Sequence, residues 1–166
     1  MRRLEGRRGN PDTMKEPRPY TATEVAIANP VIRVMSRLNT FAYRLTGGRL
    51  FGKWLHGEPI ILLTVTGRKT GRKLTVPLIH LPDGDRMIVV ASKGGMDKHP
   101  LWYLNLVSNP DVEVQRGTEV MQMRAHTADD AERAHYWPKV VALNKDFTDY
   151  QARTSRKIPL VILTPR

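Results

Sequence analysis

The chain has 166 residues, 40% of them hydrophobic, which suits one domain with a buried core. It contains no cysteine, which excludes disulfides, thiolate catalysis and cysteine-ligated iron–sulfur clusters. The formal net charge is +11, and neither a secretory signal nor an apolar run long enough to span a bilayer is present, so we expect a soluble, cytoplasmic protein.

The positive charge is concentrated in the middle of the chain. Residues 33–110 hold twelve basic and four acidic side chains, residues 1–32 hold six and four, and residues 111–166 hold nine and eight. A field of one sign concentrates anions near it, so this region is a candidate anion site. A generally basic surface, suited to solubility or to weak attraction of nucleic acid, is the alternative.

Residues 1–19 are rich in arginine, glycine and proline and lack apolar periodicity. They predict a disordered tail, or a basic arm that contacts anionic lipid or folds over a ligand. Residues 20–166 then form a single domain.

A helix is predicted over residues 30–46, with Asn29 as N-cap, Pro30 in the first position and Gly47-Gly48 as the stop. Its apolar residues share one arc that we expect to pack against the core: Val31, Val34, Met35, Leu38, Phe41, Ala42 and Leu45. Arg33, Arg37 and Arg44 form a separate stripe, either a solvated face or a border of the anion site.

Apolar runs between turn signals predict six strands, at residues 60–66, 74–81, 86–91, 112–115, 119–125 and 158–163. Pro77 marks an edge or a bulge, because proline cannot donate to a ladder. Helices are expected near residues 100–108 and from Thr127, as N-cap, to about residue 144, with Pro138 kinking or dividing the second. Strands joined by tight turns predict an α+β fold, a small antiparallel barrel with peripheral helices.

Three nearby segments combine cations, hydroxyls, glycines and aromatic rings: 67–73, 91–95 and 99–106. Glycine turns point successive backbone N–H groups at an anion, and aromatic side chains offer flat surfaces to a ring. They predict a cleft for a flat, anionic molecule, although Trp102 suits the core equally well. Walker A and Rossmann spacings are absent, and the five histidines have no metal-ligand spacing, so no metal is proposed. If the protein is an enzyme, a bound cofactor supplies the reactive atoms.

Several separated motifs resemble, in order and spacing, the deazaflavin-dependent nitroreductase family of actinobacteria, over about residues 55–165. They are Arg68-Lys69-Thr70-Gly71, Thr75-Val76-Pro77-Leu78, Ala91-Ser92-Lys93-Gly94-Gly95, Pro100 to Leu106, Asn109-Pro110, Tyr136-Trp137-Pro138, Tyr150-Gln151 and Arg156-Lys157-Ile158-Pro159. The resemblance implies a split β-barrel of the FMN-binding type that binds the deazaflavin coenzyme F-420 (F420) and reduces quinones, nitro compounds or similar acceptors.

The resemblance also implies roles for individual residues. Arg68, Lys69 and Thr70 would hold the phosphate and acidic tail, and the cofactor would be lined by Thr75, Val76, Pro77, Leu78, Val90, Ala91, Ser92, Lys93, Leu101, Trp102, Tyr103, Leu104 and Asn105. Arg33, Arg37 and Arg44 would extend the basic track for the tail. Ser92 and Tyr150 are candidates for bonding the acceptor or delivering a proton, and Ile79, Phe147 and Tyr150 for lining its pocket.

The sequence departs from the family at a few of these positions. Leu74 stands where an arginine is frequent, and Ile79, Asn144 and Phe147 replace tyrosines of the acceptor pocket. The partners implied are a small-molecule acceptor and no nucleic acid, with the chain as a monomer or homodimer and the basic tail in contact with the inner face of the membrane. The alternatives are a basic nucleic-acid-binding module, a cofactor carrier without turnover and an FMN-binding barrel.

Overall fold

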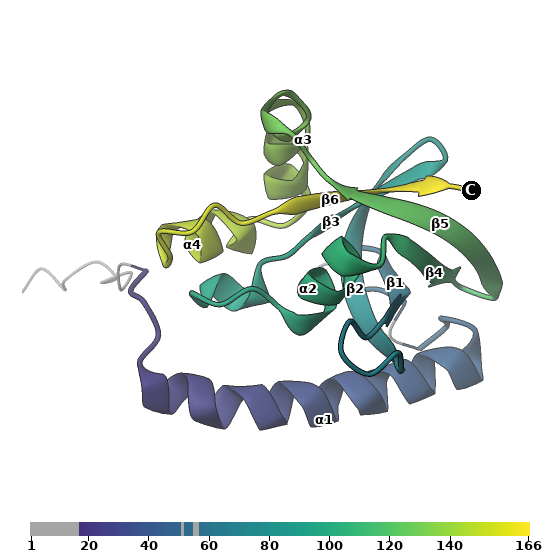
Figure 1. The fold of residues 1–166 in the computed structure, drawn as a ribbon, viewed down its shortest axis with the longest axis horizontal. Coiled ribbons are helices and arrows are strands. Elements are labelled where there is room, and N and C mark those ends of the chain that lie inside the picture. The colour runs from purple at the N-terminus through teal and green to yellow at the C-terminus, as the bar shows by residue number, and fades with distance from the viewer. Residues whose placement is uncertain (1–16, 51, 55–56) are drawn as a thin grey trace, which may run out of the picture.

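The computed structural model describes residues 17–50, 52–54 and 57–166, and a closed antiparallel barrel lies at its centre (Figure 1). The strand order around the barrel is β1-β2-β3-β6-β5-β4. The strands are β1 (Ile60–Thr66), β2 (Lys73–Asp83), β3 (Arg86–Val90), β4 (Asp111–Arg116), β5 (Glu119–Thr127) and β6 (Leu160–Pro165). All six predicted strands are present, and the predicted barrel class is confirmed.

The barrel interior is filled by alternate side chains of the strands, as the period of a β-strand requires. Ile61, Leu63 and Val65 of β1 belong to this core, together with Val89 and Val161 from the opposite wall. Ile60 and Leu62, on the other face of β1, are buried with Tyr43 in a second, smaller cluster. Because both its faces are covered, β1 reads as a continuous apolar run instead of an alternating one.

One turn and one proline show how the sequence forms the barrel. Gly117 and Thr118 connect β4 to β5, and Gly117 has the positive φ of +63° that such a two-residue turn needs. Pro77 lies opposite Leu62 of β1, whereas β2 pairs with β3 only from His80 onward. The proline therefore occupies a stretch with one neighbouring strand, where its missing N–H breaks no second ladder.

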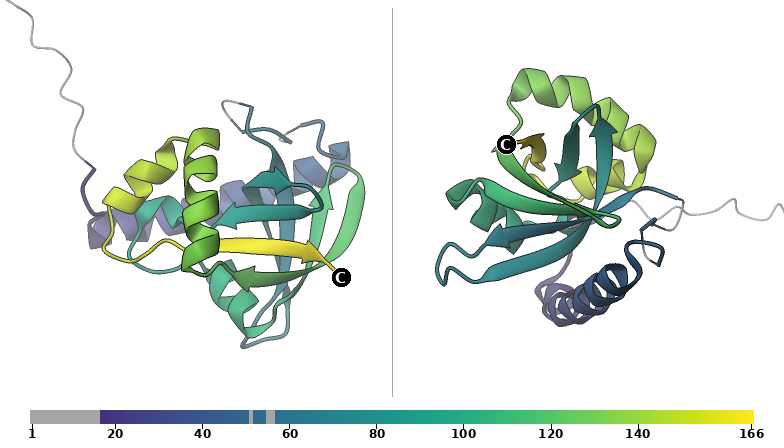
Figure 2. Two further views of the ribbon diagram at one scale, coloured as in Figure 1. Left: turned by 90° about the horizontal axis from the view of Figure 1, so that it is seen from above. Right: turned by 90° about the vertical axis from the view of Figure 1, so that its right-hand side faces the viewer.

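The helices lie around the barrel as predicted, with differences at their ends (Figure 2). α2 (Leu101–Ser108) and the 3₁₀ turn η1 (Lys93–Gly95) precede β4, and α3 (Asp130–Leu143) follows β5. α3 begins after Asp129, not Thr127, because Thr127 still pairs with Val161 while Asp129 and Glu132 form a capping box. Pro138 lies inside α3 without dividing it, and a further helix, α4 (Asp146–Ala152), was not predicted.

The first helix, α1 (Ala22–Thr46), is longer than predicted and runs along one side of the barrel (Figure 1). Asn29 is not its N-cap, because Thr21 and Glu24 form a capping box and start the helix earlier. Pro30 is therefore inside the helix. The predicted stop is confirmed: Gly47 adopts the left-handed conformation with φ of +58°.

The prediction that the apolar arc of α1 packs against the core is wrong. Leu38, Phe41 and Leu45 are 61%, 69% and 75% exposed, whereas Thr40 and Tyr43, on the other side of the helix, are buried. The Tyr43 hydroxyl donates to the carbonyl of Ile60 and accepts from the Gly117 N–H at 2.8 Å. Polar and aromatic contacts thus decide which side of α1 faces the barrel.

Candidate functional site

The loop between β1 and β2, residues 67–72, presents exposed cations at one end of the barrel. Arg68, Lys69 and Thr70 are exposed there. The Gly67 N–H donates to the Arg72 carbonyl and the Gly71 N–H to the Gly67 carbonyl, both at 2.8 Å, so the loop is tight. Guanidinium, ammonium and hydroxyl donors on a fixed backbone suit a phosphate or a carboxylate.

α2 is joined to this loop through two asparagines. The Arg68 N–H donates to Oδ1 of Asn105 at 3.2 Å, and Nδ2 of Asn109 donates to the Thr66 carbonyl at 3.3 Å. Asn105 is 4% exposed, so its amide is committed to positioning the loop. The first and third predicted segments therefore meet in space, as the sequence indicated.

The second predicted segment is a turn with unusual backbone geometry. Ser92 is in the right-handed helical region, whereas Lys93, Gly94 and Gly95 have φ of +48°, +64° and +82°. Within the described ranges, Lys93 is the one non-glycine residue with positive φ. A right-handed residue followed by a left-handed one forms a nest, whose N–H groups converge on an anion. Strain of this kind is characteristic of ligand sites.

Arg156 holds this turn from the protein side. Its Nη2 donates to the Ser92 carbonyl at 2.6 Å, and its Nε donates to the Met96 carbonyl at 2.8 Å. Both Nη atoms also lie 3.3 Å from the Ala91 carbonyl. Partial burial lowers the pKa of this guanidinium. Sequence reasoning assigned Arg156 no role, although it lies in a motif of the resemblance.

α4 packs directly against the turn because residue 95 is glycine. A Cβ at Gly95 would lie 2.5 Å from the Tyr150 carbonyl oxygen. Tyr150 is half-buried, and burial raises the pKa of its phenol. Its ring lies 6.1 Å from that of Phe147. The structure therefore brings Tyr150 to the turn that carries Ser92, and Phe147 lies beside Tyr150.

Ile79 does not join that group. It packs beneath α1 against Tyr43, Ile60 and Leu62, in a cluster separate from the one that holds Phe147 and Tyr150. The reason is the alternation of β2, which turns Ile79 to the outside of the barrel on the side covered by α1. The predicted acceptor pocket is thus only partly assembled.

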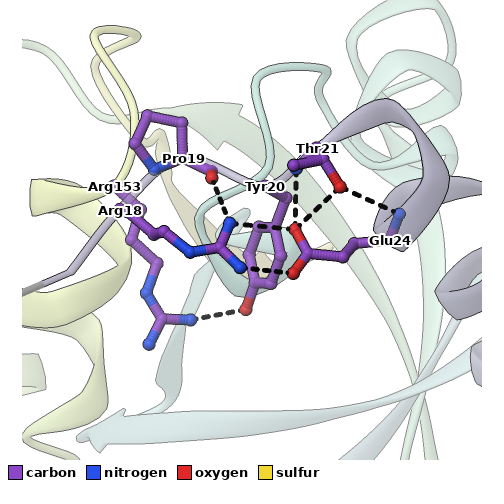
Figure 3. A network of polar contacts seen from close by, with 6 residues as sticks. All are labelled: Arg18, Pro19, Tyr20, Thr21, Glu24 and Arg153. Carbon is purple, nitrogen blue, oxygen red and sulfur yellow. Dashed lines mark hydrogen bonds and ion pairs between the residues drawn. The ribbon is translucent and has the colours of Figure 1, made fainter. Parts of the chain in front are cut away.

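Tyr20 was missed by sequence reasoning and lies beside the turn. Figure 3 shows Arg153, directly after the end of α4, donating to the Tyr20 hydroxyl oxygen. The Arg153 guanidinium is 5.3 Å from the Tyr20 ring centre and 5.9 Å from that of Tyr150. Figure 3 also shows the neighbouring ion pair between Arg18 and Glu24, which is 2.6 Å long. The beginning of α1 is therefore fixed against α4.

The other residues that we expected to line the cofactor differ in the direction in which their strand turns them and in how far they are buried. Val76 and Leu78 pack against the barrel core, whereas Thr75 accepts from Nη2 of Arg44 at 3.2 Å on the α1 side. Like Val76 and Leu78, which are only partly buried, the following residues expose some surface: Thr75, Pro77, Ser92, Lys93, Leu101, Tyr103 and Leu104. Those that are buried are Val90, Ala91, Trp102 and Asn105. Trp102 belongs to the barrel core, which favours the packing interpretation of this residue.

A basic groove of about 340 Å³ separates α1 from the start of β2. It is lined by Arg37, Thr40, Phe41, Arg44, Lys73, Leu74 and Thr75. Three cations around one groove favour an extended anion. Arg37 and Arg44 thus line one groove with Lys73, while the side chain of Arg33 lies outside the described part of the structure.

Two other observations bear on the site. In residues 17–50, 52–54 and 57–166 no cluster of three or more histidine, aspartate or glutamate side chains is placed to hold a metal ion. Over the same residues, no helix combines the length and apolar character needed to cross a membrane.

The barrel and its cationic turns define a split-barrel protein built to hold an anionic ligand. The family model for F420H(2)-dependent quinone reductases matches residues 35–165, and the chain belongs to this family. It is 41% identical over 133 residues to the F420H(2)-dependent quinone reductase Rv1261c of Mycobacterium tuberculosis (strain ATCC 25618 / H37Rv), covering 78% of this chain and 89% of the relative.

Two solved structures are also similar to this chain in sequence and in fold. A structure of an F420-H2 dependent reductase (FDR-A) is 42% identical with a TM-score of 0.60, covering 63% of this chain and 93% of its own. A second structure, described as a domain-swapped dimer, is 34% identical with a TM-score of 0.62, covering 86% of this chain and 99% of its own. The predicted family resemblance and the split-barrel fold are confirmed.

Proposed function

We propose that this chain reduces a quinone with electrons from reduced coenzyme F-420 bound across the two cationic turns. The observation that carries the proposal is the Ser92–Gly95 turn, a nest fixed by Arg156 and placed beside Tyr150. When bound, the reduced cofactor supplies a hydride from its flat ring. The protein needs to contribute binding, orientation and a proton.

The residues present fit the cofactor's anionic groups. Arg68, Lys69 and Thr70 on one loop and the 92–95 turn on the other supply charged and backbone donors for its phosphate. The groove with Arg37, Arg44 and Lys73 continues from the first loop along α1 and suits the carboxylates of an oligoglutamate tail. Leu74 stands where an arginine is frequent in the family, and Arg37, Arg44 and Lys73 around the groove compensate for the positive charge that this position lacks.

The acceptor side is formed by α4 and the turn. Quinone reduction requires one hydride and one proton. Tyr150 is protonated at neutral pH as any phenol is, and burial raises its pKa further, which makes it a weaker acid. Its phenol is therefore suited to donating a hydrogen bond to a carbonyl oxygen of the acceptor. Ser92, with Phe147 behind Tyr150, would orient the acceptor. Nitro compounds are a second acceptor class within the same proposal.

Assembly and location follow as parts of the proposal. The chain acts as a monomer or a homodimer, and the relative described as a domain-swapped dimer favours the dimer. A cytoplasmic location stays a prediction. The basic tail that we expected to contact the membrane falls largely on residues 1–16, which lie outside the described residues.

A fluorescence titration with the deazaflavin and, in parallel, with FMN tests cofactor choice. We expect selective quenching with the deazaflavin, followed by oxidation of the reduced cofactor when a quinone is added. Lys69→Ala and Lys93→Ala should each weaken cofactor binding about tenfold, the effect of one charge-assisted contact. Wild-type affinity in both variants would contradict the assigned site.

The same experiment separates the remaining alternatives. A carrier would bind the cofactor and leave quinones and nitroaromatics unreduced. A nucleic-acid-binding module would bind oligonucleotides with an affinity that collapses as salt is raised, and would not select the deazaflavin. Preference for FMN would indicate the related flavin-binding barrels.

A further inference from the structure

Arg153 is a cation at the acceptor side that no carboxylate neutralises. Its guanidinium lies 5.9 Å from the ring centre of Tyr150 and 5.3 Å from that of Tyr20. None of the ion pairs between described residues includes Arg153. In the same part of the chain its side chain makes one hydrogen bond, to the Tyr20 hydroxyl oxygen, so most of its N–H donors are left for water or a ligand.

The neighbouring acidic residues do not explain this placement. Asp149 lies four residues before Arg153, which is the spacing of a favourable helical ion pair, yet the Arg153 side chain bonds Tyr20 instead. Glu24, which Figure 3 shows in the same network, accepts from Arg18 with both of its carboxylate oxygens. The positive charge of Arg153 is therefore available to an anion that arrives from solvent.

Close packing places the Arg153 side chain along the 92–95 turn. A Cβ at Gly95 would lie 3.1 Å from the Cβ of Arg153, and a Cβ at Gly94 would lie 3.8 Å from the hydroxyl oxygen of Tyr20. The arginine side chain therefore starts beside Gly95 and ends at the tyrosine beside Gly94. The Tyr20 hydroxyl accepts from Nη1 and so fixes the guanidinium next to the turn.

Reduction of a quinone creates negative charge that a fixed cation can stabilise. The quinone takes up a hydride, and the product before protonation is a quinol anion with its charge on oxygen. A proton, drawn ultimately from water, then completes the quinol, and the cofactor is left oxidised by two electrons. A charged group already held where this charge develops lowers the barrier without having to move. The Tyr150 phenol is a neutral donor, whereas a guanidinium supplies positive charge as well.

We propose that Arg153 is a catalytic residue of the acceptor site, whose guanidinium binds the reacting oxygen of the quinone and stabilises the charge that the hydride brings there. Tyr20 is a positioning residue that acts through Arg153. This inference rests on the proposed function and adds a charge-stabilising group to it. It also gives the segment before α1 a part in the reaction, because Tyr20 precedes the N-cap of that helix.

Steady-state reduction of a soluble quinone by the full chain, with saturating reduced deazaflavin, tests the proposal. Arg153→Gln removes the charge, and we expect kcat to fall about hundredfold while KM for the quinone stays within about threefold, because the contact strengthens in the transition state. Arg153→Lys keeps a charge and should lie about tenfold below the wild type. The matched control is Arg124→Gln, because Arg124 is an exposed arginine of β5 that pairs with Asp111 of β4, and its kcat should equal that of the wild type.

Tyr20→Phe isolates the positioning effect. Loss of the hydroxyl that holds the guanidinium should lower kcat about fivefold, the effect of one hydrogen bond. The same change should have no further effect in the Arg153→Gln background, because that background already lacks the guanidinium. Equal losses in both backgrounds would overturn the positioning role of Tyr20. The control is Tyr136→Phe, which removes a hydroxyl that donates to Asp83 of β2 and should leave kcat unchanged.

A binding measurement without turnover checks the same contact. A hydroxynaphthoquinone that is anionic at neutral pH carries the charge of the product on a quinone ring. Titrated against protein loaded with oxidised deazaflavin, it should bind Arg153→Gln about tenfold more weakly than it binds the wild type or Arg124→Gln. Circular dichroism checks folding, and the affinity of Arg153→Gln for the deazaflavin should stay within about twofold of the wild type.

An unchanged kcat, or unchanged binding of the anion, in Arg153→Gln would overturn the proposal. A loss of deazaflavin affinity in that variant would also overturn it, because the guanidinium would then belong to the cofactor's anion site. If Arg153→Gln does not fold, Arg153→Met takes its place. A wild type that reduces neither quinones nor nitro compounds would remove the proposed function together with this inference, whereas an active wild type and an equally active Arg153→Gln would remove the inference alone.

Discussion

The left-handed backbone of Lys93 gives a test in which stability and cofactor binding change in opposite directions. At φ of +48° a Cβ approaches the neighbouring carbonyl oxygen, and glycine removes that contact. Lys93→Gly and Lys93→Ala both lack the lysine side chain, so a comparison between them isolates the Cβ. We expect the glycine variant to have a free energy of unfolding about 1 kcal/mol larger than the alanine variant.

Urea denaturation measures this difference, and thermal melting should show a midpoint about 2–4 °C higher for the glycine variant. Both variants should bind the deazaflavin about tenfold more weakly than wild type, because both lack the cation. Equal stability of the two variants would refute the argument that the turn is strained. Improved stability with unchanged affinity would place the anion site elsewhere.

Three further changes test the surrounding structure. Gly95→Ala should destabilise the protein by about 2 kcal/mol in thermal melting, because the new Cβ meets the Tyr150 carbonyl at 2.5 Å and φ is +82°; an unchanged melting midpoint would contradict the close packing. Burial lowers the pKa of His80 to about 4, so the unfolded chain binds more protons than the native one between that pH and about 6.5. Stability should therefore fall by about 3 kcal/mol as pH drops through this window, and urea titrations of His80→Gln should show a flatter profile. Tyr43→Phe leaves the Gly117 N–H without its acceptor and should cost about 2 kcal/mol in urea denaturation, whereas a neutral effect would mean that α1 is fixed by other contacts.

The sequence by itself determined the barrel and most of the residues at the cationic turns. Apolar runs separated by glycine turns define strands through local preferences, and a motif such as Ser92-Lys93-Gly94-Gly95 places its charges and its turn on adjacent residues. Both the strand preferences and the turn motif depend only on neighbouring residues, so they can be interpreted from the sequence without knowing the fold. The family resemblance came from the same local motifs.

Tertiary structure decided the features that depend on distant segments. The apolar arc of α1 was expected to pack inward, but Tyr43 binds Gly117 and Ile60, and the periodicity of a helix does not reveal which partner it meets. Likewise, Arg156 reaches the carbonyls of the 91–96 turn, and Tyr20 reaches Arg153 across most of the chain. Such contacts arise only when the barrel closes, because closure brings its two ends and the flanking helices into fixed positions.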